Sequence, residues 1–151
     1  MFKHILIPTD GSKLSLAAAE AGVRFAKALG ARVTGFFAAP PATPIVFKGL
    51  LPVGYAAPEE HEESIRKASD RYLAIIDKAA RAAGVGCELI SETSDYPAEA
   101  IVAAAKKRRC DLIFMASHGR RGVRRESLLG SETQKVLSQA PIPVLVYRAR
   151  N

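Results

Sequence analysis

Apolar positions along the chain form short unbroken runs that alternate with longer stripes of helical spacing. The run Ile5-Leu6-Ile7 lies within residues 3–8 and ends in turn-forming residues, which is typical of a strand buried on both faces. Apolar side chains then recur three and four positions apart over residues 14–29, which predicts an amphipathic helix that ends at Gly30. Its buried stripe is expected to comprise Leu14, Ala17, Ala18, Ala21, Phe25, Ala28 and Leu29.

The same alternation continues through the middle of the chain. Residues 32–39 predict a second strand, and residues 59–83 predict the longest helix, with glutamates in its first turns and Gly84 at its end. Residues 87–92 alternate weakly and predict a partly exposed strand. The stripe of the longest helix is expected at Ile65, Ala68, Tyr72, Ile75, Ile76, Ala79 and Ala83.

The last third of the chain predicts four further elements. Residues 96–109 read as a helix with Pro97 in its first turn, and residues 111–116 as a second fully buried strand. Residues 131–140 read as a short helix that begins with a Ser131–Gln134 capping box. Residues 142–147 read as a final strand, which Pro143 marks as an edge.

This order predicts an α/β fold with an open parallel five-stranded sheet, helices on both faces and right-handed crossovers. The two most apolar strands, residues 3–8 and 111–116, are expected at its centre. With 151 residues and no internal repeat, residues 1–151 are expected to form a single domain. Residues 40–58 carry five prolines but are too apolar for a free linker, which favours a lid or a packed excursion.

Composition narrows the class of protein. Apolar residues make up 48% and charged residues 25%, which fits a globular domain and excludes a disordered, collagenous or coiled-coil chain. No apolar run approaches the roughly 20 residues that cross a bilayer, and no signal-peptide pattern is seen, so a cytoplasmic protein is expected. The formal charge of +7 favours anionic partners. Nucleic acid is not expected, because no aromatic-rich strand offers a platform on which the bases of a single strand could stack.

The two cysteines, Cys87 and Cys110, have no C-x-x-C or Cys/His neighbours, so a zinc site is not expected. Each begins a predicted strand. Two strands between them would separate them by about 14 Å at about 4.8 Å per strand. A disulfide needs Cα atoms within about 7 Å. Both are therefore expected to be reduced thiols.

Candidate chemistry lies where the two central strands end. Ligands of open α/β sheets bind beyond the carboxyl ends of the strands, so residues 9–12 and 117–119 should face each other across one crevice. The Asp10 carboxylate there suits a ribose hydroxyl or a Mg²⁺ ion held through water. An Asp or Ser at positions 10–12 equally suits the N-cap of the helix that follows.

The second loop, residues 116–133, combines three glycines, hydroxyl residues and four arginines at positions 120, 121, 124 and 125. Gly130 and Ser131 open a helix, where backbone N–H groups favour a phosphate. His118 could donate to that phosphate or simply be solvated, and the whole segment could instead be a mobile loop before an ordinary capped helix. Lys106–Arg109 reads either as a basic patch or as cations at a helix C-terminus.

Several signatures of common enzymes and nucleotide folds are absent. The chain has no G-x-x-x-x-G-K-[ST], G-x-G-x-x-G, H-E-x-x-H or G-x-S-x-G pattern. It also offers no evident general base or nucleophile, so catalysis is not indicated.

On four segments together, the chain resembles the universal stress protein family in its small single-domain form. These are I-L-I-P-T-D-G-S (5–12), D-L-I-F-M-A-S-H-G (111–119), L-L-G-S (128–131) and P-I-P-V-L-V-Y-R (141–148). The resemblance implies a flavodoxin-like fold with strand order 3-2-1-4-5 that binds an adenine nucleotide. It also implies a homodimer formed through the edge strand, residues 142–147.

Family members that hold ATP resemble G-x2-G-x9-G-[ST], which falls here on Ala116, Gly119, Gly130 and Ser131. The chain departs from that pattern twice, since Ala116 replaces a glycine and ten residues separate Gly119 from Gly130. The resemblance further implies that Asp10 meets the ribose and that backbone near Ala39 meets the adenine. The implied nucleotide contacts are Pro8, Thr9, Asp10, Ser12, Ala39, Ala116, His118, Gly119, Gly130, Ser131, Glu132 and Thr133.

Three hypotheses about function follow. The first is a dimeric stress-response sensor or regulator that binds ATP, with Mg²⁺, and hydrolyses it slowly if at all. The second is a nucleotide-free interaction module that dimerises and docks a partner protein through residues 40–58 or 120–125; Ala116 and the longer spacer favour it. The third is an ATP-dependent enzyme, whose turnover would depend on Asp10.

Overall fold

The computed structural model describes residues 1–41, 58–119 and 129–149. Within these ranges strands and helices alternate along the chain, as predicted. The strands are β1 His4–Thr9, β2 Arg32–Ala39, β3 Cys87–Thr93, β4 Leu112–Ala116 and β5 Val144–Tyr147, and the helices are α1 Lys13–Leu29, α2 Pro58–Ala83, α3 Pro97–Lys107 and α4 Ser131–Gln139.

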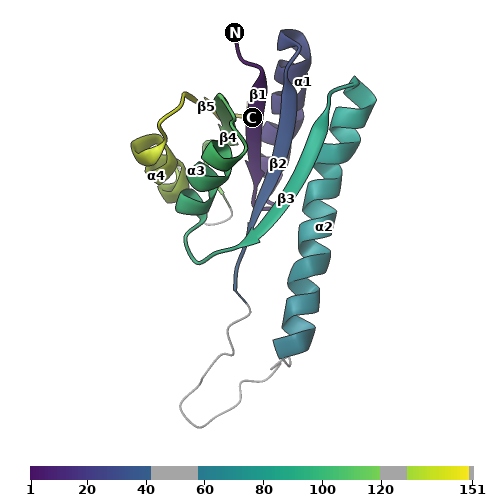
Figure 1. Ribbon diagram of the computed structural model, residues 1–151. Coiled ribbons are helices and arrows are strands. Elements are labelled where there is room, and N and C mark those ends of the chain that lie inside the picture. Colours follow the sequence, from purple (N-terminus) through teal and green to yellow (C-terminus); the bar gives the residue numbers. More distant parts are fainter. Residues whose placement is uncertain (42–57, 120–128, 150–151) are drawn as a thin grey trace.

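The five strands form one parallel sheet in the order β3-β2-β1-β4-β5, so the predicted fold class and strand order are confirmed (Figure 1). β1 pairs with β2 on one side and with β4 on the other, and every residue of β1 and β4 is buried. Since the chain reverses its direction of winding between β1 and β4, the carboxyl ends of these two strands mark the switch point of the sheet.

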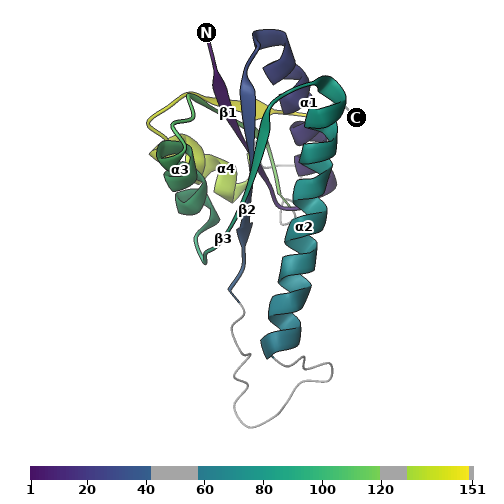
Figure 2. The ribbon, with the colours of Figure 1, turned by 45° about the vertical axis from the view of Figure 1, so that its right-hand side comes forward.

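The helices cover the two faces of the sheet in pairs. α1 and α2 lie on one face and α3 and α4 on the other, as both ribbon views show (Figures 1 and 2). Alternate residues of each strand serve the two cores: Ile5 and Ile7 pack on the side of α1 and α2, whereas Leu6 packs on the side of α3 and α4. The early turns of α2 extend beyond the carboxyl ends of the strands (Figure 1).

The buried face of α1 differs from the predicted stripe. Leu14, Ala28 and Leu29 are exposed, and the buried residues are Ser15, Ala18, Ala19, Ala21, Gly22, Val23 and Ala26. A Cβ at Gly22 would lie 2.8 Å from Ile7 Cδ1 and 3.0 Å from Phe114 Cδ1. Small side chains therefore let the helix lie close to the sheet, and that close packing selects a face that periodicity of large residues did not mark.

The buried face of α2 also differs from the predicted stripe. Ser69, Leu73, Ile76 and Ala80 are buried, whereas the other expected stripe residues are half-buried at its flanks. The five residues at positions 72–76 are all apolar and cover more than half of the helix circumference, so the sequence alone does not define the centre of the face. Residues at helical spacing on either side of that centre then share partial contact with α1 and β2.

Element ends follow the predictions within a few residues. Gly30 adopts φ +66° and Gly84 φ +71°, as expected of residues that terminate helices. β5 begins at Val144 rather than at Ile142, although the Pro143 carbonyl still accepts a hydrogen bond from Ile113 N. As the last strand of the order, β5 is an edge strand, which confirms the prediction from Pro143.

Two strands, β2 and β1, separate β3, which begins at Cys87, from β4, which Cys110 precedes by two residues, so the expected separation is confirmed. Both cysteines are free; Cys110 is buried, whereas Cys87 is half-buried. None of the helices that the structure describes is long and apolar enough to cross a membrane.

Candidate functional site

The turn between β1 and α1 is organised by three hydroxyl groups. Ser12 caps α1, its Oγ accepting from Ser15 N at 3.2 Å, as the N-cap prediction for residues 10–12 required. Ser15 Oγ donates to the Ser12 carbonyl at 3.0 Å and accepts from Asp10 N at 3.3 Å. Thr9 Oγ1 lies 3.0 Å from Ser15 Oγ and accepts from Gly11 N at 3.1 Å. Because the Ser15 hydroxyl already donates its proton to the Ser12 carbonyl, the Thr9 hydroxyl is the donor in its hydrogen bond with Ser15 Oγ.

Asp10 and Gly11 complete this turn. Asp10 Oδ1 accepts from Ser12 N at 2.9 Å, which holds the carboxylate at the end of β1. Gly11 has φ +78°, and a Cβ there would overlap the ring of Tyr72 on α2. A side chain at position 11 is thus excluded both by backbone conformation and by space. α2 therefore helps to hold the turn that carries Asp10.

Two hydrogen bonds join the two ends of the second loop. Gly130 N donates to the Ser117 carbonyl at 2.7 Å, and Thr133 Oγ1 donates to the Ala116 carbonyl at 3.0 Å. Ser117 N in turn donates to the Tyr147 carbonyl of β5 at 3.0 Å. The start of α4 is therefore fixed to the end of β4, with one more residue between Gly119 and Gly130 than the nucleotide-binding pattern has.

The predicted capping box at the start of α4 is wrong. Gly130, not Ser131, is the N-cap, and none of the described side chains forms a capping hydrogen bond there. Gln134 Nε2 instead donates to the Leu129 carbonyl at 2.9 Å. The hydrogen bond from Gly130 to Ser117 places Ser131 already inside the first turn, so its hydroxyl is not used as a cap. By contrast, α1 is capped by Ser12, and Ala98 N of α3 donates to Glu132 Oε2 at 3.0 Å.

The two loops meet across the switch point, as expected. A Cβ built on Gly119 would overlap Asp10 Oδ2, so the carboxylate lies directly against the glycine backbone. A Cβ on Gly130 would lie 3.2 Å from His118 Cα and 3.3 Å from the Ser117 carbonyl. The structure thus brings Asp10, Gly119, Gly130 and the first turn of α4 together.

The remaining predicted contact residues lie around this centre with other partners. His118 is half-buried, and its Nδ1 lies 3.1 Å from Ser117 Oγ. Glu132 forms an ion pair with Lys135 at 3.3 Å in addition to its bond with α3, so its carboxylate is directed to neighbouring helices. The Ala39 carbonyl accepts from Ser94 N at 2.9 Å, beside β3. Pro8 is buried in β1, in register with Phe36.

Parts of two predicted segments lie outside the described residues. These are residues 42–57 of the 40–58 excursion, and residues 120–128, which include Gly122 and the four arginines. Of the Lys106–Arg109 group, Lys106 and Lys107 occupy the last turn of α3, and Arg108 forms a 2.6 Å ion pair with Glu88.

Ser15 was not predicted as part of the site, and Ser117 was predicted only as a member of the loop 117–119, without its bond to Gly130. Ser15 is buried and joins Thr9, Asp10 and Ser12, while Ser117 holds Gly130 through its carbonyl. A serine at an inward-facing position of a small-residue helix is the signal that could have identified Ser15. Nothing local marks Ser117, because its role depends on a residue 13 positions later in the chain.

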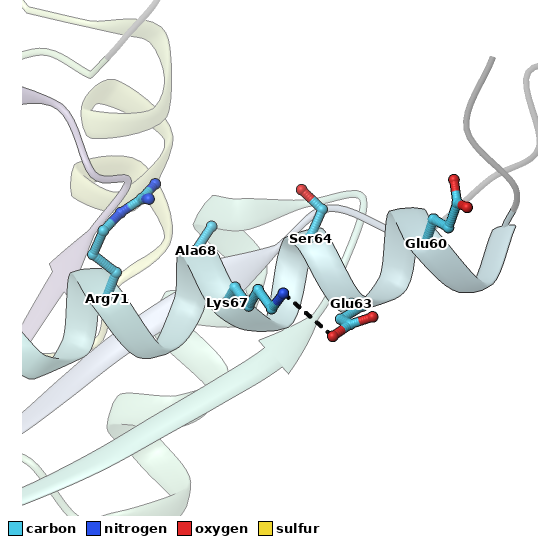
Figure 3. Close-up of a pocket in the computed structure, with 6 residues that line it drawn as sticks. All are labelled: Glu60, Glu63, Ser64, Lys67, Ala68 and Arg71. Atoms are coloured by element: carbon cyan, nitrogen blue, oxygen red, sulfur yellow. Dashed lines mark ion pairs between the residues drawn. The ribbon is translucent and has the colours of Figure 1, made fainter. Parts of the chain in front are cut away.

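Two cavities lie along α2. One has a volume of about 350 Å³, and its described lining, from Glu60 to Arg71, comes entirely from α2 (Figure 3). It includes the ion pair between Glu63 and Lys67 at 3.3 Å. Because the described residues supply a single helical wall, it does not form a site with the switch point. The second cavity, of about 340 Å³, lies between α2 and the ends of β2 and β3. Among the described residues, no three His, Cys, Asp or Glu side chains gather as a metal site.

Comparison with known proteins agrees with this architecture. The model of the Universal stress protein family matches residues 1–148. The chain belongs to the universal stress protein family. It is 34% identical over 149 residues to universal stress protein MJ0531 of Methanocaldococcus jannaschii, covering 98% of this chain and 83% of that protein. It is also 34% identical to a universal stress protein of Thermus aquaticus, covering 98% of this chain and all of the relative.

Solved structures show the same fold. Protein MJ0577 of Methanocaldococcus jannaschii superposes with a TM-score of 0.81 at 25% identity, over 100% of this chain and 99% of that one. A universal stress protein in complex with cAMP has a TM-score of 0.71 at 21% identity, with 99% of each chain covered. A family member from Arabidopsis thaliana with AMP bound has a TM-score of 0.67 at 16% identity, covering 98% of this chain and 92% of that one.

Proposed function

We propose that this universal stress protein binds an adenine nucleotide, ATP with Mg²⁺ in preference, and acts as a homodimeric sensor or regulator in the cytoplasm. The observation that carries the proposal is the contact between the Asp10 carboxylate and Gly119, beside the start of α4. It unites the two loops at the switch point of the sheet, where α/β proteins bind ligands. The complexes of structural neighbours with cAMP and AMP favour an adenine nucleotide as the ligand class.

The phosphates are assigned to the α4 side of the crevice. Among the described residues no side chain caps α4, so the N–H groups of its first turn and the Ser131 hydroxyl suit an anion. The backbone of Gly119, which carries no side chain in the crevice, allows close approach. Since Asp10 is an anion at neutral pH, it is assigned to a ribose hydroxyl or to Mg²⁺ through water, and not to a phosphate oxygen.

Thr9, Ser12 and Thr133 are assigned to holding the two loops. Thr133 donates its proton to the Ala116 carbonyl, and Thr9 donates to Ser15. Each hydroxyl therefore fixes backbone that would face the nucleotide. Glu132 is assigned in the same way to the start of α3, where it accepts from Ala98 N.

The two departures from the ATP-binding pattern are compatible with this assignment. Ala116 is buried, and its side chain belongs to the core on the α1 side of the sheet. The methyl group thus adds apolar packing without filling the crevice. Gly130 stays hydrogen-bonded to Ser117 despite the ten-residue spacer. These two features weigh for nucleotide binding over the alternative of a nucleotide-free module that docks a partner protein.

The base is assigned to the end of β2. Since the Ala39 carbonyl faces β3, and residues alternate their backbone direction along a strand, the Ala38 backbone faces β1 and the crevice. We therefore assign the adenine-facing backbone to Ala38 and the neighbouring wall to Ala39.

The homodimer is assigned to β5. The carbonyls of Pro143 and Tyr147 accept from β4, so the backbone groups of Val144 and Val146 face the open edge of the sheet. An open edge with apolar residues is a template for pairing with a second strand.

The test of the nucleotide site compares two variants by equilibrium dialysis with ATP and Mg²⁺. In Gly130→Val the side chain would press on His118 and Ser117, so ATP retention should be lost. In Lys106→Ala, at the far end of α3, retention should equal that of the wild type. Equal retention by Gly130→Val and wild type would refute the assignment.

A further inference from the structure

The second cavity, of about 340 Å³, adjoins the proposed base position. It lies between the early turns of α2 and the ends of β2 and β3, and Ala39 forms part of its wall. Pro40 and Ile65 add apolar surface, while Ser69 and Thr93 contribute hydroxyl groups. A volume of this size is typical of small-molecule sites. Its described lining combines three apolar residues with six polar or charged ones, so a ligand there would meet both kinds of surface.

Ser69 is the unusual member of this lining. Its side chain is buried, with 4% of the residue exposed, and its Oγ has no hydrogen-bond partner among the residues that the structure describes. A buried serine within a helix commonly bonds to the carbonyl four residues earlier, and Ser69 does not. An unpaired buried hydroxyl destabilises a folded protein, so such groups call for an explanation. A ligand in the cavity that Ser69 lines would provide the missing partner.

We propose that Ser69 is a base-recognition residue: a purine base enters the cavity between α2 and the ends of β2 and β3, and Ser69 hydrogen-bonds to it. This inference rests on the proposed nucleotide function and adds α2 to the site. A hydroxyl both donates and accepts, so it can pair with a ring nitrogen or with an exocyclic amino group.

The charges of the cavity favour a base over a phosphate. Glu62 and Asp70 oppose a single cation, Arg66, among its described lining residues. The excess of negative charge disfavours a phosphate group at this point. Ala39, Pro40 and Ile65 instead suit the face of a neutral planar ring. The phosphates would remain at α4, on the other side of Asp10.

The test uses Ser69→Ala, with Ser64→Ala as a matched control on an exposed position of α2. Three probes are titrated into the full chain: adenosine, ATP and tripolyphosphate, which lacks a base. Ser69→Ala should lower the affinity for adenosine and for ATP by the same factor, about 5- to 10-fold for one hydrogen bond, and leave the affinity for tripolyphosphate unchanged. Ser64→Ala should change none of the three.

The ligand-free proteins provide a second measurement. Because Ser69→Ala removes an unpaired hydroxyl, it should raise the Tm of the ligand-free protein by about 2–4 °C, while it weakens binding of the base. ATP affinity equal in Ser69→Ala and wild type would overturn the inference and leave the proposed function intact. Wild-type binding of tripolyphosphate without adenosine would show that no base is recognised, and would overturn this inference together with the choice of an adenine nucleotide. A wild type that binds none of the probes would overturn the proposed function and this inference together.

Discussion

The Asp10 carboxylate lies so close to Gly119 that no side chain fits between them, because a Cβ on the glycine would overlap Oδ2. The two residues are 109 positions apart and follow the two central strands of the sheet. Their contact joins a loop that carries a carboxylate to a loop that leads into the start of α4. The proposed site depends on this proximity.

Gly119→Ala tests that contact. The added methyl would displace the Asp10 carboxylate from its position against the loop. We expect ATP affinity to fall at least about tenfold, the effect of losing one hydrogen bond to a charged group. The matched control is Gly86→Ala, where a Cβ would lie 3.7 Å from Arg32 Cβ in ordinary contact. Isothermal titration calorimetry on both variants decides; a similar affinity in the two would contradict the account.

Ser15→Ala tests the hydroxyl network behind Asp10. The change removes the acceptor of the Thr9 hydroxyl, which is buried, and of Asp10 N. We expect a loss of about 1–3 kcal/mol in the free energy of unfolding, together with weaker ATP binding. Urea denaturation measures the first effect. Ser138→Ala, at an exposed position of α4, should be nearly neutral. Unchanged stability in Ser15→Ala would argue against the network.

The environment of His4 predicts that the free energy of unfolding decreases at acidic pH. His4 Nε2 lies 2.7 Å from Thr34 Oγ1, and its buried Nδ1 has no hydrogen-bond partner within the described part of the chain. Burial, followed by the Arg32 charge, lowers its pKa below 6.5, against smaller opposite effects of Asp111, Glu88 and the Arg108 backbone. The unfolded chain therefore binds the proton more tightly, and stability decreases as the pH falls from about 6.5 toward the folded pKa.

The measurement is urea unfolding at pH 7.5 and at pH 5.5. His4→Gln should show a smaller decrease between the two conditions than wild type. The control, His61→Gln at an exposed position of α2, should retain the full decrease. Asp111 titrates outside this pH range. Burial alone would raise its pKa, but hydrogen bonds from the N–H groups of Lys3 and His4 outweigh that effect, so its pKa lies below 3.8. Equal decreases in His4→Gln and wild type would show that His4 is not the group responsible.

Cys110 should be an unreactive thiol in the folded protein. Burial raises its pKa from 9.0 to about 11. Near neutral pH this leaves about 100-fold less thiolate than an ordinary cysteine. In Cys87→Ser, Ellman's reagent should therefore react with native protein about 100-fold more slowly than with unfolded protein. Similar rates in the two states would contradict the buried position.

A proline in β5 should disrupt the proposed dimer. Val146→Pro removes an N–H that faces the open edge and leaves the bonds to β4 in place. We expect a monomer by light scattering coupled to gel filtration. The matched control is Leu89→Pro on β3, at the opposite edge of the sheet, where the N–H also faces outward. A dimer that survives Val146→Pro but not Leu89→Pro would place the interface on β3.

The sequence predicts this sheet well because its signals are local and strong. Unbroken apolar runs at residues 5–7 and 112–116 mark strands buried on both faces, and the topology of parallel sheets then brings residues 9–12 and 117–119 together. The helix faces are harder to predict. α1 packs through Ala18, Gly22 and Ala26, because small residues allow close approach, whereas periodicity favours the larger Leu14 and Leu29.

Those parts of the site that depend on tertiary contacts were not predictable. Ser131 resembles an N-cap in sequence, yet the bond between Gly130 and Ser117 shifts the cap by one residue. Ser15 and Ser69 are ordinary helix residues in the sequence. Their importance arises from what surrounds them: in the described structure, the Ser15 hydroxyl has three backbone and hydroxyl partners, and the Ser69 hydroxyl has none.

The most direct measurement is a calorimetric titration of the wild-type chain with ATP and Mg²⁺, paired with its Tm at millimolar ATP. The account predicts saturable heat with one nucleotide per chain and a higher Tm in the presence of ATP. Absence of both heat and a Tm increase at millimolar ATP would contradict the claim that the Asp10 loop and the start of α4 form one nucleotide site.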